Sequence, residues 1–209
     1  MEKLTVGRYI IGMVQTNFYY MHREGSRETI VFDPADAGGK IFEVLTDQGL
    51  TVKAIFLTHA HFDHILGLHD LQSLTGAPVY CSAAEKGLCA SPRKNCSQDV
   101  GRPVTVEPDI WLEDLQTIEE AGIRLQMIDT PGHTEGSCCY YLMDDGILVT
   151  GDTLFQGSVG RADLPTGNMT TLIGSIKTRL LALPDDTVCL PGHGDQTTIG
   201  WEKKHNYFL

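Results

Sequence analysis

Residues 58–64, THAHFDH, place three histidines and an aspartate directly after the apolar run AIFL. The apolar run predicts a buried strand, and the residues that follow the cluster predict a helix. His59 and His61 are two positions apart, so in an extended chain their side chains point the same way. Asp63 and His64 then begin the helix, where the positive end of the helix dipole favours a carboxylate. This pattern predicts a metal site where a buried strand ends.

Three further stretches follow the same pattern of an apolar strand that ends in a His or Asp beside Gly, Pro or Thr. They are QMIDTPGH, ILVTGD and TVCLPGH, which end at His133, Asp152 and His193. Asp152 alone could be a turn former, but its two oxygens could also bridge two ions. If the strands run side by side, all these residues gather at one rim of the sheets, which is a favoured place for a site. The candidate metal ligands are therefore His59, His61, Asp63, His64, His133, Asp152 and His193.

Length and composition favour a single globular domain over residues 1–209 of the chain. Of these residues 42% are hydrophobic, and no repeat or linker divides the sequence. The 16 Lys and Arg against 27 Asp and Glu give a net charge of −11. Such a chain is unsuited to nucleic acids, because binding them requires neutralising phosphates. No signal sequence or bilayer-spanning apolar run is evident, so we expect a cytoplasmic protein without a membrane partner. The oligomeric state stays open.

The hydrophobic periodicity predicts a mixed α/β fold, because strands and helices are interspersed. Strands are expected over 16–22, 28–34, 53–59, 123–129, 137–143, 146–152 and 187–190. Helices are expected over 38–50, 65–76 and 170–183, with a final helical turn over 200–208. Residues 81–108 predict a short helix with irregular connections, and they could either shape the mouth of a pocket or cover a sheet edge. The six cysteines contain no C-x-x-C pair and are expected to be free thiols.

The segments THAHFDH, TPGHTEG, TGDTLF and PGHG, in this order, resemble the metallo-β-lactamase superfamily. Together with GSVGRADLPTGN and TTIGWEKKHNYFL, they are most similar to its glyoxalase II (hydroxyacylglutathione hydrolase) branch, in particular the short bacterial members. The resemblance extends from about residue 14 to the end of the chain. It implies a four-layer αββα sandwich, in which two sheets face each other, helices lie outside and metals bind at one edge.

The resemblance also implies how two divalent ions are held. It assigns His59, His61 and His133 to the first ion, Asp63, His64 and His193 to the second, and Asp152 to both. Zinc is the expected metal, with iron and manganese as alternatives. The best-known β-lactamase branch has a Cys at the position of Asp152, and the flavodiiron branch has a Glu at that of His61. Both differences favour the glyoxalase II branch.

The expected reaction is hydrolysis of a small acyl thioester such as S-D-lactoylglutathione. Two ions about 3.5–4 Å apart can share a water and present it as hydroxide at neutral pH. Asp63 and Asp152 are the expected catalytic carboxylates, since Asp63 could orient the attacking water. The resemblance places Arg161 near the substrate, where it could bind a carboxylate, although a structural salt bridge with Asp163 would also explain it.

Other functions stay open. Longer members of the branch hold glutathione with a C-terminal helical region that has no counterpart before Leu209, so the thiol carrier is not assigned. A persulfide dioxygenase would use a single iron held by His59, His133 and Asp152. A hydrolase of another ester or lactone would keep all seven ligands. A relic that binds metal without turnover is the non-enzymatic alternative.

Overall fold

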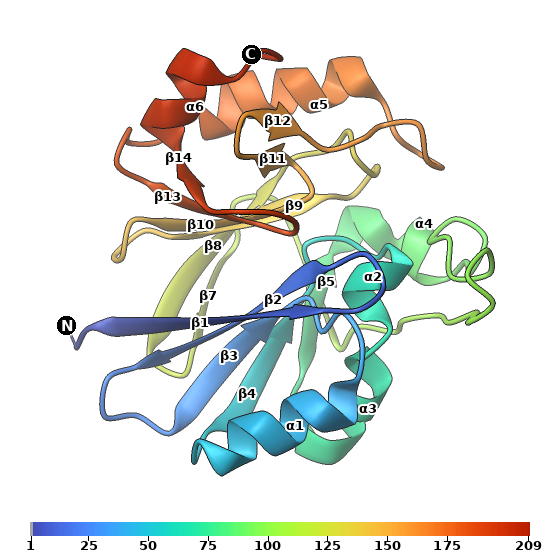
Figure 1. Cartoon of the computed structure of the whole chain (residues 1–209), viewed down its shortest axis with the longest axis vertical. Coiled ribbons are helices and arrows are strands. Elements are labelled where there is room, and N and C mark those ends of the chain that lie inside the picture. The colour runs from blue at the N-terminus through green and yellow to red at the C-terminus, as the bar shows by residue number, and fades with distance from the viewer. Residues whose placement is uncertain (1) are drawn as a thin grey trace.

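A computed structural model describes residues 2–209 of the chain. Two six-stranded sheets face each other, and helices cover both outer faces, as Figure 1 shows. This arrangement confirms the αββα sandwich expected from the sequence. Over the same residues, none of the helices combines the length and the apolar character that crossing a bilayer requires.

The first sheet is built by the N-terminal half of the chain. Its strands, in pairing order, are β1 (Leu4–Ile11), β2 (Thr16–Arg23), β3 (Glu28–Phe32), β4 (Thr51–Phe56), β5 (Val79–Ser82) and β6 (Ile110–Leu112). The first three strands pair antiparallel, and β3 to β6 run parallel. Parallel neighbours need crossover connections, which α1 (Gly38–Asp47) and α3 (Leu68–Thr75) supply here. Both helices pack their apolar sides on the outer face of this sheet.

The second sheet is built by the C-terminal half. Its strands, in pairing order, are β14 (Thr197–Thr198), β13 (Val188–Pro191), β10 (Ile147–Gly151), β9 (Cys138–Leu142), β8 (Ile123–Asp129) and β7 (Thr117–Glu120). Only β10 and β13 of this sheet pair in parallel. The outer layer comprises α5 (Met169–Ser175), the π-helical turn η2 (Ile176–Leu180), α6 (Ile199–His205) and the small hairpin of β11 (Leu154–Phe155) and β12 (Ser158–Val159).

Aromatic side chains fill the space between the sheets. The ring of Phe56 lies 5.4 Å from that of Phe32 and 5.2 Å from that of Tyr140, measured between centroids. All three are fully buried, and the Tyr140 hydroxyl donates a hydrogen bond of 2.9 Å to the carbonyl of Leu57, which directly follows β4 of the opposite sheet. Cys138 belongs to this inner core, whereas the next residue along β9 faces the outer helices. All six cysteines are buried, free thiols, as expected.

The structure departs from the expected elements in several places, and the following three bear on the site. Helix 65–76 begins only at Leu68, because the Gly67 N–H bonds to the Pro34 carbonyl (2.9 Å) and interrupts the helix. The preceding residues form a separate short helix, α2 (Phe62–Ile65). Strand β1, for which we made no prediction, pairs with β2 along its whole length. The strand expected over 53–59 ends at Phe56, so the histidine cluster begins in a loop.

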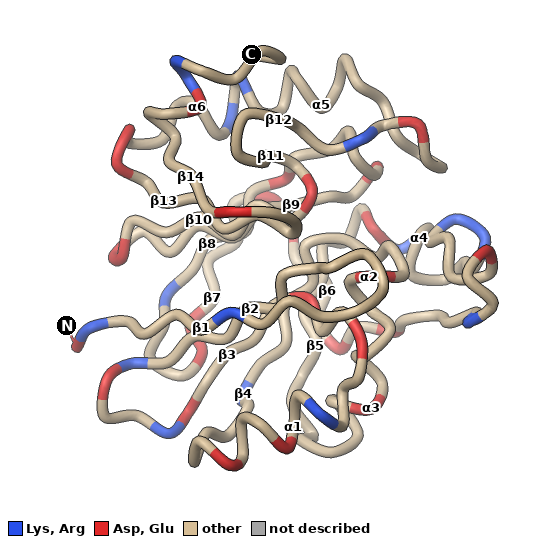
Figure 2. Tube along the Cα trace, viewed as in Figure 1, with Lys and Arg blue, Asp and Glu red and all other residues tan. Residues whose placement is uncertain are grey.

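Charged side chains are distributed over the outer loops and helices of both halves of the molecule. In Figure 2, red and blue segments are scattered along the trace, many of them in outer loops and helices. This pattern is expected, because an ionised group loses hydration when it is buried without a partner. The rim between the two sheets, described below, nevertheless contains several buried ionisable groups. Their burial requires an interaction that offsets the lost hydration.

Replacing Phe56 with Ala should lower the free energy of unfolding by about 3–5 kcal/mol, because it leaves a cavity between the sheets. Urea unfolding of the chelator-treated protein measures this loss without a contribution from bound metal. Leu74→Ala is the control, since this side chain is 51% exposed. The control should change stability by less than about 0.5 kcal/mol. Equal losses in both variants would contradict the central position of Phe56.

Candidate metal centre

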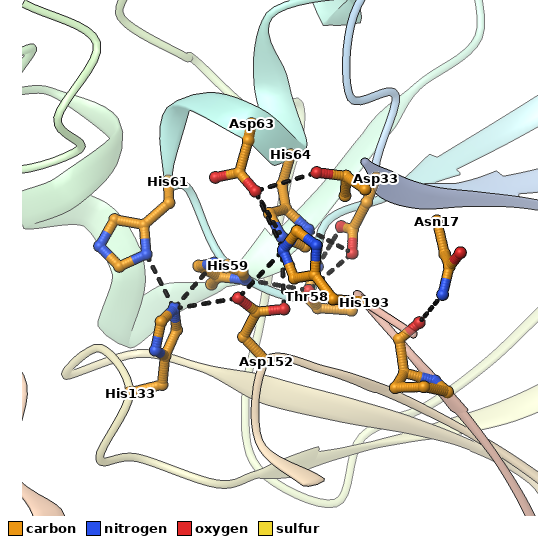
Figure 3. A network of polar contacts seen from close by, with 12 residues as sticks. Asn17, Asp33, Thr58, His59, His61, Asp63, His64, His133, Asp152 and His193 are labelled. Carbon is orange, nitrogen blue, oxygen red and sulfur yellow. Dashed lines mark hydrogen bonds and ion pairs between the residues drawn. The ribbon is translucent and has the colours of Figure 1, made fainter. Parts of the chain in front are cut away.

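The seven predicted ligands meet at one rim, where loops from the ends of four strands converge (Figure 3). His59 and His61 lie in the loop after β4, and Asp63 and His64 lie in α2. The other three follow the second sheet's strands: His133 comes after β8, Asp152 after β10 and His193 after β13. The structure therefore brings together side chains from both halves of the chain.

Three histidines form a first cluster that is almost completely buried. Nε2 of His133 lies 2.9 Å from Nδ1 of His61 and 3.2 Å from Nε2 of His59. A tetrahedral zinc site with bonds of about 2.0–2.1 Å separates its nitrogens by about 3.3 Å. The observed separations are close to this value. The three nitrogens therefore surround a single point at which an ion could bind.

Asp63, His64 and His193 form a second cluster. Oδ2 of Asp63 lies 3.2 Å from Nε2 of His193 and 3.4 Å from Nε2 of His64. Asp152 faces both clusters, since its Oδ2 lies 3.6 Å from Nε2 of His133 and 3.5 Å from Nε2 of His193. Its position between the two groups is the position that a bridging carboxylate requires.

Two observations show that the cluster fits divalent cations. Nε2 of His64 and Oδ1 of Asp152 are buried without a hydrogen-bond partner among residues 2–209, although buried polar atoms are nearly always paired. Burial and neighbouring histidines lower the pKa of His61 to about 3, so its ring is neutral and has a lone pair to donate. Burial opposes a charge on His193, but contacts with Asp152 and Asp63 outweigh it and raise its pKa to about 9. The second cluster thus attracts positive charge.

Asp33 fixes the orientation of His64 and was not among the predicted residues. This buried carboxylate accepts a hydrogen bond of 3.0 Å from Nδ1 of His64, which directs Nε2 of the ring into the cluster. It also accepts bonds from the backbone N–H (2.8 Å) and hydroxyl (2.7 Å) of Thr58. Hydrogen bonds of this kind orient metal-binding histidines. The signal was available in VFDP, which also ends a strand in an aspartate.

The N-terminal hairpin supports the second cluster through residues that carry no recognisable motif. The side-chain amide of Asn17, labelled in Figure 3, donates to the carbonyls of Pro191 and Gly194, each at 2.9 Å. These two residues lie on either side of His193 in the chain. The backbone N–H of Asn17 donates to the Gly192 carbonyl at 2.7 Å. These three bonds hold the loop that carries His193. The pairing of β1 with β2 places Asn17 there, and this tertiary arrangement leaves no local sequence signal.

Arg161 contributes to the site through its backbone as well as its side chain. Its carbonyl accepts a hydrogen bond of 2.7 Å from Nδ1 of His133, which directs the other ring nitrogen into the first cluster. Its guanidinium forms two bonds of 2.7 Å with the carboxylate of Asp163, and both side chains are exposed. The salt bridge considered from the sequence is therefore present, and it lies where solvent can reach it.

An αββα sandwich is typical of metal-dependent hydrolases when a His and Asp cluster at one edge can hold two ions. The chain belongs to the metallo-beta-lactamase superfamily, whose family model matches residues 11–193. It is 39% identical over 204 residues to the probable metallo-hydrolase YqgX of Bacillus subtilis, covering 97% of this chain and 96% of that protein. It is 32% identical over 189 residues to the hydroxyacylglutathione hydrolase GloC of Haemophilus influenzae, covering 89% of each.

A solved structure agrees with this family membership. The crystal structure of the BLEG-1 B3 metallo-beta-lactamase superposes with a TM-score of 0.92 at 37% identity. The match covers 98% of this chain and 99% of that one. The fold and resemblance expected from the sequence are therefore confirmed.

Asp152→Ala should reduce the metal content of the purified protein by about one ion per chain, because the carboxylate faces both clusters. Elemental analysis after dialysis against the metal measures the change. Asp186→Ala, at an exposed position away from the rim, is the control and should keep the original content. A full complement of metal in the Asp152 variant would show that this carboxylate does not bridge.

Proposed function

We propose that the seven residues hold two divalent ions. His59, His61 and His133 bind the first, Asp63, His64 and His193 bind the second, and Asp152 contacts both. Their donor separations and the two unpaired buried atoms support this assignment. We propose zinc as the metal, since a mixed imidazole and carboxylate set suits it well.

The proposed reaction is hydrolysis of a small acyl thioester such as S-D-lactoylglutathione. The observation that carries this proposal is the complete double cluster with Asp152 facing both halves. When bound, paired ions supply an activated water and polarise a carbonyl group. The similarity to GloC, a relative named as a hydroxyacylglutathione hydrolase, supports a thioester as the substrate.

The chain's own residues would position the reacting groups on one side of the centre. The His193 side chain is 27% exposed, whereas the histidines of the first cluster are at most 2% exposed, so the centre opens beside His193. The Thr16 hydroxyl donates a hydrogen bond of 3.0 Å to Asp63. This bond holds the Asp63 carboxylate in place to orient an attacking water. The Phe155 ring, 6.1 Å from that of His193, offers an apolar surface at the same opening.

The dioxygenase alternative has one observation in its favour. His59, His133 and Asp152 lie close enough to form a mononuclear site, with nitrogen–nitrogen and nitrogen–oxygen distances of 3.2 and 3.6 Å. A mononuclear enzyme, however, gives no reason for a second group of converging donors, of which His64 is fully buried. The second cluster therefore favours hydrolysis over oxygen activation.

The zinc-loaded protein should release thiol from acyl thioesters of glutathione or another small thiol. A thiol-trapping dye measures the release over a panel of carriers, and chelation followed by zinc addition should abolish and restore it. Elemental analysis of the protein as purified completes the test. Absence of thiol release from every carrier in the fully loaded protein would refute thioester hydrolysis. One iron per chain with oxygen consumption on a persulfide would favour the dioxygenase.

Arg161→Ala should raise KM for a carboxylate-bearing thioester about fivefold with little change in kcat, because an exposed ion pair contributes up to about 1 kcal/mol. Asp163→Ala provides a comparison of opposite sign, since it frees the guanidinium and should lower KM. A thioester without a carboxylate should respond to neither change. Unaltered KM values in both variants would show that Arg161 contributes to the site only through its backbone contact with His133.

A further inference from the structure

Residues 81–108, whose role the sequence leaves open, place one buried carboxylate beside the first cluster. Glu85 is the last residue of the short 3-10 helix η1 (Ala83–Glu85), which precedes α4 (Lys86–Cys89). Its side chain is fully buried, and burial raises its pKa to about 7. A carboxylate removed from water in this way needs donors around it.

The donors to Glu85 come from the two loops that carry the first cluster. Oε1 accepts a hydrogen bond of 2.9 Å from the Ala60 N–H, and Ala60 lies between His59 and His61. The Thr134 hydroxyl, next in the chain to His133, lies 3.1 and 2.9 Å from the two carboxylate oxygens. One carboxylate therefore connects the loops that supply all three histidines.

Close packing leaves little freedom in this arrangement. A Cβ atom on Gly136 would lie 2.3 Å from the backbone nitrogen of Glu85, so the loop after His133 is in direct contact with η1. The two loops are also joined through the histidine rings themselves and by the bond from the Cys138 N–H to the Thr58 carbonyl (2.9 Å), which lies before His59. Glu85 adds the bond to the backbone between His59 and His61.

We propose that Glu85 is a positioning residue for the first metal site, and that its bonds to Ala60 and Thr134 hold the three histidines at ion-binding separation. This inference rests on the proposed two-metal assignment. Groups that orient metal ligands typically change metal affinity about 10–100-fold when they are removed. Glutamine at this position replaces one acceptor oxygen with an NH₂ donor, so a bond that Thr134 donates to that oxygen must be lost or reversed.

The test isolates the first site in the full-length protein. In the background Asp63→Ala with His193→Ala, the second cluster loses two of its three donors, and one zinc ion should remain bound. Competition with a chromophoric chelator measures the affinity for Zn²⁺. Adding Glu85→Gln should weaken this affinity about 10–100-fold. Thr134→Val keeps Glu85 and removes one of its donors, so it should weaken the affinity for Zn²⁺ less. This variant takes the place of Glu85→Gln in the test if Glu85→Gln fails to fold.

Glu202→Gln is the matched control. Glu202 is also fully buried and accepts bonds from Thr197 (2.6 Å), Asn206 (2.7 Å) and the Gly157 N–H (3.1 Å), but none of these residues borders the metal ligands. Its replacement should lower stability in the metal-free protein and leave zinc affinity unchanged. The positioning role would be refuted if neither Glu85→Gln nor Thr134→Val changed the affinity for Zn²⁺. It would also be refuted if Glu202→Gln weakened this affinity as much as Glu85→Gln does. A background that binds no zinc would instead refute the metal assignment itself, and the inference with it.

Discussion

The burial of metal-type donor atoms at the rim between the sheets is the constraint on which the rest of the structure depends. Polar atoms out of water destabilise a fold unless they find partners. Here His64 and Asp152 each present a buried atom without one among the described residues, and the pKa of His61 lies far below its usual range. A bound cation would satisfy these atoms, so the order of the rim loops and metal binding are thermodynamically linked.

The scaffold prepares this rim with hydrogen bonds from residues that do not face the metals. Asp33 orients His64, the Arg161 carbonyl orients His133, and Asn17 holds the loop of His193. They come from three different parts of the chain. Because each ring is already held in place, an ion would lose little affinity to the ordering of its ligands.

The sequence predicts the ligands better than it predicts what supports them. The seven candidate ligands share a local pattern, since each ends or follows an apolar strand. Such a pattern can be recognised in the sequence without knowledge of the fold. Asn17 and Glu85 have no such signal, because their partners lie far along the chain. The break at Gly67 has the same origin, since its N–H bonds to a distant carbonyl. Short edge strands such as β14 were missed because two residues establish no periodicity.

The bonds between Asn17 and the loop of His193 also order events during synthesis. Asn17 precedes the carbonyls of Pro191 and Gly194 by 174 and 177 residues, so its hairpin leaves the ribosome well before the loop of His193. Until that loop emerges, the amide of Asn17 has no carbonyl to bind, and the second group of ligands lacks a member. A nascent chain that ends before His193 can thus offer an incoming ion the three histidines of the first cluster but not the complete second cluster. The proposed second site can therefore form only after β13 and the loop that follows it have been translated.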